Sequence, residues 1–203
     1  MAWTRRHWAT AAGNVLLLLV YAAFAFAHAM SLRDRPRLSV GLLLAFETLV
    51  VFFLLQRRDP DAVWHSWQTW LTTLGGTFAP LLLRPVAGAS DLLAGEVLQV
   101  VGCALQVAAI LSLNRSFGLL PAHRQIKREG LYRVVRHPLY CAYTVTQIGY
   151  VLDNPALWNL VVLVAAAGFQ VLRILDEERF LLRYPAYAAY SRSTRWRLVP
   201  LVW

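Results

Sequence analysis

Long apolar blocks separated by short polar loops dominate this sequence. The chain is 58% hydrophobic and only 15% charged, whereas a soluble domain is nearer half apolar and a quarter charged. Each block is compared with the roughly 20 residues that a helix needs to cross the hydrocarbon of a bilayer. We therefore expect an all-α, polytopic transmembrane helical bundle of about six spans, with five as the alternative, in a single domain over residues 1–203. The blocks are residues 14–30, 38–56, 67–86, 92–113, 138–152 and 156–176.

Three of these blocks have irregular features. The third contains Gly75, Gly76 and Pro80, which favours a kink or an interruption. The fifth is short, and the residues Asp-Asn-Pro at 153–155 predict a tight turn, so the fifth and sixth blocks should form an antiparallel hairpin. The first block resembles a signal peptide, but it is rather long and no clear cleavage site follows, so we expect a retained membrane helix.

The distribution of Lys and Arg predicts the orientation of the bundle. Basic residues concentrate in the loop 114–137 and in the segment after residue 176, which we expect to be cytoplasmic. Arginines at 5–6 and 57–58 should then lie inside too, whereas those at 33–37 would lie outside, so the topology of the first two helices stays open. A net charge of +9 distributed in this way disfavours nucleic acid as a partner. The expected location is an integral membrane protein, in a bacterial inner membrane, with the active site facing the cytoplasm.

The two cysteines, Cys103 and Cys141, both lie within apolar blocks. Neither belongs to a His/Cys cluster with the spacing of metal ligands, so no metal site is expected. We interpret both as small buried apolar residues.

The segment 130–140 concentrates candidate binding residues at a membrane boundary. It reads GLYRVVRHPLY, with two Arg, one His and two Tyr immediately before a helix. Pro138 suits the first turn of that helix, because its missing N–H would have no partner there. The amides that follow can hold an anionic group, and His137 can donate or accept a hydrogen bond near neutral pH. We favour a binding site over a purely basic membrane anchor.

Two further groups of polar residues occur within the blocks. Arg173 and Glu177 lie one helical turn apart, so they can pair or flank one ligand. A second group forms one stripe along the fourth block, which either joins helices through hydrogen bonds or lines a cavity. His28 and Glu47 are also polar residues in lipid, and no partner is predicted for either. The stripe consists of Glu96, Gln99, Cys103, Gln106 and Ile110.

The C-terminal half resembles a known family. The residues that carry the resemblance are LNRSFG at 113–118, PAHR at 121–124, GLY at 130–132, RHPLY at 136–140, then Arg173, Glu177, Glu178, Leu181, Tyr184, Tyr187, Tyr190 and RLVP at 197–200. As a set they are similar to the isoprenylcysteine carboxyl methyltransferase family in its broad bacterial sense, which includes phospholipid methyltransferase relatives. Any one of these motifs alone would be weak.

The resemblance implies an integral membrane methyltransferase that uses S-adenosylmethionine. Residues 1–112 would be mainly membrane scaffold, and residues 113–203 a catalytic region with a cytoplasmic cofactor pocket. The acceptor would be lipophilic, either an isoprenylcysteine-type carboxylate on a lipidated substrate or another lipid-like small molecule. No dedicated general base stands out, which favours an acceptor that is already ionised, and thus O-methylation. The identity of the acceptor and the oligomeric state stay open.

Site roles follow from the same resemblance and from the chemistry of the cofactor. His137 and the helix start would hold its carboxylate, the glutamates its ammonium or ribose hydroxyls, and the tyrosines its adenine or sulfonium. Relatives often have Gly where Asn114 stands and Asn where His123 stands, so the acceptor can differ from theirs. The catalytic candidates are Arg173, Glu177 and His137; the cofactor-binding candidates are Tyr132, Arg136, His137, Pro138, Tyr140, Glu177 and Glu178; and the substrate-binding candidates are Gln99, Asn114, Arg115, His123, Arg124 and Tyr187.

Two other functions remain open. Membrane sterol reductases use NADPH on a related helical scaffold, but they would need more arginines around the dinucleotide phosphates. A membrane accessory protein without activity would have a degenerate site, and intact His137, Tyr140 and Glu177 weigh against that interpretation. A small transporter would predict an internal repeat, and none is visible.

Overall fold

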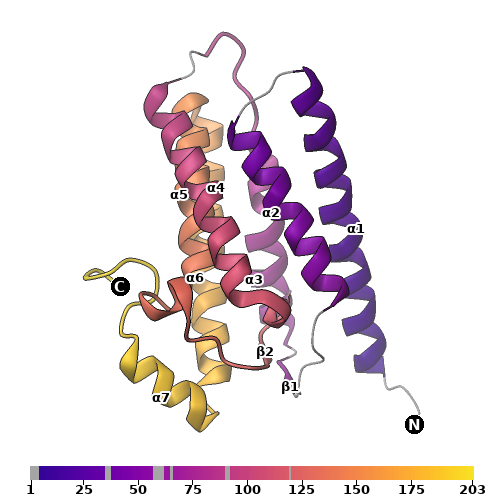
Figure 1. The fold of residues 1–203 in the computed structure, drawn as a ribbon, viewed down its shortest axis with the longest axis vertical. Helices are drawn as coiled ribbons and strands as arrows, with labels where there is room; N and C mark the ends of the chain where they lie inside the picture. Colours follow the sequence, from indigo (N-terminus) through magenta and orange to yellow (C-terminus); the bar gives the residue numbers. More distant parts are fainter. Residues whose placement is uncertain (1–4, 35–37, 57–61, 65, 90–91, 119) are drawn as a thin grey trace.

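The computed structural model describes residues 5–34, 38–56, 62–64, 66–89, 92–118 and 120–203, and it is mainly helical (Figure 1). The helices are α1 (Arg5–Asp34), α2 (Leu38–Leu55), α3 (Trp67–Phe78), α4 (Leu93–Leu113), α5 (Pro138–Asp153), α6 (Leu157–Leu181) and α7 (Pro185–Ser193). Short 3-10 helices are η1 (Ala79–Leu82), η2 (Asn114–Ser116) and η3 (Gly130–Arg133). Strands β1 (Ala62–Val63) and β2 (Ala122–His123) pair antiparallel, with Ala62 opposite His123.

Each of the six expected apolar blocks forms a helix, which confirms the predicted helical class. Among the described residues, four segments are long and apolar enough to cross a membrane: Val15–Arg33, Leu38–Leu55, Leu93–Ser116 and Leu157–Leu181. Helices α3 and α5 have only 12 and 16 residues, fewer than the roughly 20 that a complete crossing requires. The structure thus supports a membrane bundle with four candidate spans, and the count of six stays a prediction.

The predicted interruption of the third block is confirmed. Helix α3 ends at Phe78, and Pro80 lies in the first turn of η1. A Cβ atom on Gly75 would lie 2.6 Å from a ring carbon of Phe169. A glycine is therefore needed at Gly75 for α3 to pack closely on α6.

The charged loops gather at one end of the bundle. In Figure 1 the long helices run side by side, and the chain start, β1, β2 and α7 lie at the lower end. The loop between α4 and α5 and the segment after α6 therefore share that end, whereas the turn at 154–156 lies at the opposite end. This is the arrangement that the charge distribution predicts, although Arg33, at the last turn of α1, lies at the opposite end. The expected positions of the arginines at 35, 37, 57 and 58 fall outside the described residues.

Small residues allow α4 and α5 to pack closely along each other. A Cβ atom on Gly102 would lie 2.2 Å from the Thr146 hydroxyl, and one on Gly149 would lie 2.7 Å from the Gly95 carbonyl. Association of helices in lipid depends on such close contacts, because the hydrophobic effect does not operate between them there. The expected hairpin of α5 and α6 is also present, with its turn at residues 154–156.

A cluster of apolar side chains packs α7 against the end of α6. Phe180, Leu181, Tyr187 and Tyr190 are all buried there, and Trp64 packs against them. Burial of each such side chain from water contributes about 1.5–3 kcal/mol. This cluster brings the tyrosines of α7 next to the loop that precedes α5.

Candidate functional site

A cavity of about 510 Å³ lies between the helices and extends to the end that carries α7. Its volume falls within the roughly 300–1,000 Å³ that is usual for small-molecule sites. Most of the predicted site residues line it: Gln99, Arg124, Tyr132, Arg136, His137, Tyr140, Arg173, Glu177 and Tyr187. Pro138, Glu178, Asn114, Arg115 and His123 are described residues that do not line it. The fold therefore brings together residues from α4 to α7 at one cavity.

Arg173 and Glu177 face the cavity on either side of Tyr140. The Tyr140 hydroxyl donates to Glu177 Oε2 at 3.1 Å. The Arg173 guanidinium lies 5.2 Å from the centre of the Tyr140 ring, and its Nη1 donates to Thr77 Oγ1 at 3.3 Å. The expectation that Arg173 and Glu177 share one face is confirmed. Together they place one negative and one positive group at the same wall of the cavity.

The neighbouring acid, Glu178, is placed in a different environment. Consecutive residues on a helix are separated by about a quarter turn, and Glu178 is buried on a face that does not line the cavity. Its carboxylate oxygens lie 2.8 Å from Arg136 Nε, 3.1 Å from His137 Nε2 and 2.7 Å from Arg197 Nε. These contacts fit a residue that positions the site; the predicted contact of Glu178 with a cofactor stays a prediction.

The segment that follows α7 is paired with the loop that precedes α5. The amide of Arg136 donates to the Trp196 carbonyl, and the amide of His137 donates to the Arg197 carbonyl, both at 2.9 Å. The Arg197 side chain then reaches Glu178 on α6. Arg136 also donates through Nη1 to the Ser191 carbonyl at 3.2 Å. These contacts show that Arg136 helps to order the loop before α5, and its predicted contact with a cofactor stays a prediction.

The predicted helix start at Pro138 is confirmed, with His137 as the residue just before it. The first hydrogen bond of the helix runs from the Cys141 amide to the His137 carbonyl at 3.2 Å. The amides of Leu139 and Tyr140 thus precede the first intrahelical bond, as at any helix start. His137 is buried, and its ring stacks on Tyr140 with centroids 5.7 Å apart.

Two tyrosines of α7 differ in how their hydroxyls are used. Tyr190 donates to the Tyr132 carbonyl at 2.7 Å, whereas the buried hydroxyl of Tyr187 has no hydrogen-bond partner among the described residues. Tyr187 is 4% exposed and lines the cavity. Burial raises the pKa of Tyr190 to about 12, and it raises the pKa of Tyr187 as well. Both are therefore neutral hydroxyls, and Tyr187 is available to a ligand.

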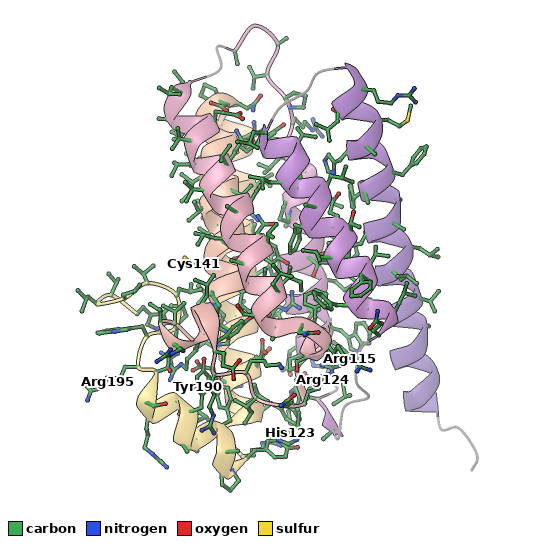
Figure 2. The ribbon with its side chains drawn as sticks, in the orientation of Figure 1. Arg115, His123, Arg124, Cys141, Tyr190 and Arg195 are labelled. Atoms are coloured by element: carbon green, nitrogen blue, oxygen red, sulfur yellow. The ribbon has the colours of Figure 1, made fainter. Side chains whose placement is uncertain are left out.

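Three of the predicted substrate residues lie away from the cavity. Asn114 and Arg115 are exposed, and the Arg115 Nε donates to the Gln56 carbonyl. The His123 ring stacks on Tyr184 with centroids 3.8 Å apart. Figure 2 shows Arg115, His123 and Arg124 together at the end of the bundle that carries α7, and of these only Arg124 lines the cavity.

Asn114 has a backbone conformation that glycine adopts most easily, which fits the glycine expected at this position from the resemblance. Its φ is +53° and its ψ is −135°, a region that side chains other than glycine rarely adopt. Its side-chain oxygen accepts the Arg115 amide at 2.7 Å, which stabilises the turn locally. The glycine of relatives is thus accounted for by backbone conformation without a contact to substrate.

We expect Asn114→Gly to stabilise the protein by about 1 kcal/mol, because glycine adopts this conformation without strain. The measurement is the thermal midpoint of unfolding in detergent micelles. Gly130→Ala is the matched opposite, since Gly130 has φ +57° and an added Cβ would lie 2.3 Å from the Ser112 hydroxyl. It should lower the midpoint. A lower midpoint for Asn114→Gly would show that the lost hydrogen bond from the Arg115 amide costs more stability than the relief of backbone strain provides.

Several residues that line the cavity were not predicted from the sequence. They come from both halves of the chain, and examples are Tyr21 of α1, Thr77 of α3, and Tyr143, Thr146 and Gln147 of α5. Only Tyr143 had a usable sequence pattern, because it lies three residues after Tyr140 and so shares its face of α5. The structure also supplies the missing partners of two polar residues in lipid, since His28 Nδ1 lies 2.8 Å from Glu47 Oε2.

Comparison with known proteins is consistent with this site. Residues 96–183 match the model of the isoprenylcysteine carboxyl methyltransferase (ICMT) family. We refer to residues 96–183, which match this model, as the ICMT-family region. It is also 32% identical over 115 residues to protein-S-isoprenylcysteine O-methyltransferase A of Arabidopsis thaliana, an alignment that covers 49% of this chain and 54% of that relative. The chain thus spans about half the length of this relative, and the resemblance expected from the motifs is confirmed over the matched residues.

The ICMT-family region begins in α4 and ends just after α6. It includes the loop before α5 and the pair Arg173 and Glu177. It does not include the α7 tyrosines, the segment that contains Arg197, or helices α1 to α3. The α7 tyrosines and helices α1 to α3 line the cavity, so part of its wall comes from regions of the chain that the family match does not cover.

Proposed function

We propose that this chain is an S-adenosylmethionine-dependent membrane methyltransferase that acts on a lipophilic acceptor. The observation that carries the proposal is the cavity wall on which Glu177, Tyr140 and Arg173 lie together, within the ICMT-family region. The Arabidopsis relative is named as a protein-S-isoprenylcysteine O-methyltransferase, which supports the same reaction class.

The residues present fit the chemistry of this cofactor. Its ammonium or ribose hydroxyls need an acceptor, and the Glu177 carboxylate faces the cavity. Its carboxylate needs donors, and the start of α5 next to His137 offers early helix amides. The buried hydroxyl of Tyr187 lines the same cavity with no hydrogen-bond partner among the described residues. A buried hydroxyl without a partner is costly in an empty protein, so it fits a site built for a polar ligand.

The chain would contribute mainly binding and alignment. When bound, S-adenosylmethionine would supply an electrophilic methyl group attached to a cationic sulfonium. Tyr140 and Tyr132 would present electron-rich rings to a cation, and Arg173 would hold an anionic acceptor. Binding between the helices would displace water from the two reactants, and their alignment would provide most of the rate acceleration.

The side chains at the wall favour an acceptor that is already ionised. A carboxylate needs no general base, whereas an amine or a phenol would have to lose a proton. The raised pKa of Tyr187 keeps that residue protonated, because burial disfavours its phenolate. It would therefore serve as a hydrogen-bond donor and not as a base. This supports O-methylation of a carboxylate carried by a lipid-like molecule arriving from the bilayer.

Calorimetric titration of the detergent-purified protein tests the proposal. We expect saturable binding of S-adenosylmethionine and its demethylated product, and no binding of NADPH. Glu177→Ala should weaken that binding by about tenfold, the value of one charge-assisted hydrogen bond. Asp176→Asn is the matched control, because Asp176 is adjacent but contacts Thr72 and Arg179 away from the cavity.

The other outcomes would each lead to a different function. Binding of NADPH alone would place the protein with the membrane reductases. Folded protein that binds none of the three ligands would fit an accessory protein. If S-adenosylmethionine bound the wild type and Glu177→Ala with equal affinity, Glu177 would not contact the cofactor. The assignment of the cofactor itself would stand.

A further inference from the structure

Residues 198–203 form a loop that is closed by its own backbone hydrogen bonds. The amides of Arg197 and Leu198 donate to the Trp203 carbonyl at 2.7 and 2.9 Å. The Trp203 amide donates in turn to the Val199 carbonyl at 3.1 Å. The Arg197 guanidinium also lies 5.1 Å from the centre of the Trp203 ring. Backbone and side-chain contacts therefore hold this loop, which lies outside the ICMT-family region, in one conformation.

The side chains at the tip of the 198–203 loop are apolar and exposed. Leu201 is 83% exposed, Val202 is 76% exposed and Val199 is 46% exposed. Leu201 also has φ +68°, a backbone conformation that is unfavourable for a residue with a bulky side chain. The closed loop thus holds Leu201 in a strained conformation that presents an apolar side chain outwards. A strained and exposed apolar residue indicates that the tip contacts an apolar partner.

Contacts with α6 and with the start of α5 fix the level of the loop along the bundle. The Arg197 carbonyl accepts the His137 amide at 2.9 Å, and the Arg197 side chain donates to Glu178 at 2.7 Å. Glu178 lies in the last turn of the candidate span Leu157–Leu181. In Figure 1 the loop lies at the level of the lower part of the long helices, whereas α7 lies lower. The loop is therefore level with the end of a span, where a helix leaves the hydrocarbon of a bilayer.

Basic and aromatic side chains precede the apolar tip. Arg192 and Arg195 are exposed, and Figure 2 shows Arg195 on the outer surface, between α7 and the loop. Trp196 follows Arg195 in the chain, and Trp203 closes the loop. Arginine is attracted to the phosphates of lipid headgroups, and tryptophan is enriched at the boundary between headgroups and hydrocarbon. The charge and the aromatic residues therefore match a lipid surface as the partner of the tip.

We propose that the 198–203 loop inserts into the interface of the bilayer, with Leu201 and Val202 among the acyl chains and Arg195 at the lipid phosphates. A second copy of this chain would also cover apolar side chains. Such a partner would not account for the position of the loop at the end of a span or for the adjacent arginines. The proposal goes beyond the proposed function and does not depend on the reaction that the cavity carries out.

Photolabelling of the unmodified full chain tests this contact. The protein is placed in nanodiscs of phosphatidylcholine and phosphatidylglycerol that carry a diazirine on one acyl chain, irradiated and digested with trypsin. Cleavage after Arg197 releases a peptide that begins at Leu198, and cleavage after Arg183 and Arg192 releases the α7 peptide 184–192. We expect about tenfold more lipid label on the first peptide than on the second, the ratio that burial of one apolar side chain provides.

The variants are Leu201→Gln and Ala189→Gln. Leu201→Gln should lower the label on the peptide that begins at Leu198 several-fold and leave the label on peptides of α4 and α6 unchanged. Ala189→Gln is the matched control, because it places the same polar group on an exposed position of α7, away from the loop. It should keep the wild-type label. Both positions are exposed, so the thermal midpoint of each variant should equal that of the wild type.

The unmodified protein is sufficient to overturn the proposal. Equal lipid label on the peptide from Leu198 and on the α7 peptide would do so, whatever the variants show. A cross-link through this peptide to a second copy, in place of lipid label, would also overturn it and would assign the loop to an interface between copies. Unchanged label in folded Leu201→Gln would contradict insertion of the tip. None of these results depends on cofactor binding, so a failure of the methyltransferase function would leave them unaffected.

Discussion

Glu178→Ala is expected to be among the most destabilising single substitutions at this site, by about 3–5 kcal/mol. Glu178 is 3% exposed and its carboxylate contacts Arg136, His137 and Arg197. Removal of one partner from a buried ion cluster leaves the remaining charges uncompensated. The measurement is the thermal midpoint and the denaturant dependence of unfolding in detergent, with cofactor affinity determined in parallel on the folded fraction.

Cofactor affinity should fall together with stability in this variant. Glu178 does not line the cavity, but it holds His137 and the Arg197 segment against the loop before α5. Arg197→Gln is the matched milder change, since the Arg197 side chain is 31% exposed and the contact of Glu178 with Arg136 would remain. A Glu178→Ala protein of wild-type stability would contradict the positioning role. A destabilised variant with normal cofactor affinity would show that the cluster stabilises the fold without shaping the site.

Tyr187→Phe and Tyr190→Phe are expected to have opposite effects. Removal of the Tyr190 hydroxyl deprives the Tyr132 carbonyl of its donor, which should cost about 1–3 kcal/mol of stability. Removal of the Tyr187 hydroxyl deletes a buried group that has no hydrogen-bond partner among the described residues. The unliganded Tyr187→Phe protein should therefore keep or gain thermal stability, and it should bind the cofactor or the acceptor at least several-fold more weakly.

The raised pKa values predict how this pair responds to pH. Burial raises the pKa of Tyr190 from 10.0 to about 12, so the stability that this residue contributes is complete below its unfolded pKa. That contribution is lost only as the pH rises through the folded pKa. Around neutral pH both tyrosines are protonated. The difference in thermal stability between Tyr187→Phe and Tyr190→Phe should therefore not depend on pH in this range. Normal ligand affinity in Tyr187→Phe would show that its hydroxyl does not contact either ligand.

The order of the helices and the ends at which the charged loops meet could be predicted from hydropathy and charge. The apolar blocks were long enough to be read individually, and the interruption near Pro80 and the helix start at Pro138 follow from the missing N–H of proline. The count of complete spans was less secure, because α3 is shorter than its apolar block, and α5, like its block, has fewer residues than a full crossing requires. Length alone does not tell a full crossing from a shorter packed helix.

The candidate site could be predicted in part. Arg173, Glu177, Tyr140 and His137 carry recognisable motifs and line the cavity. The sequence could not distinguish Glu177 from Glu178, because neighbouring positions on a helix face different surroundings, and those surroundings depend on which elements pack on each face. The predicted substrate residues Asn114 and His123 were chosen from loop motifs. A loop motif does not determine the direction in which a side chain points.

The sequence by itself determined that this chain is a helical protein with membrane-length apolar segments and that its motifs lie in the C-terminal half, because hydropathy, charge and proline positions act locally along the chain. Only the tertiary structure decided that Glu178 joins Arg136, His137 and Arg197, that His28 meets Glu47, and that the Tyr187 hydroxyl has no hydrogen-bond partner among the described residues. Each of these depends on contacts between residues far apart in the chain. Their distances are set by how the helices pack, which no local pattern specifies.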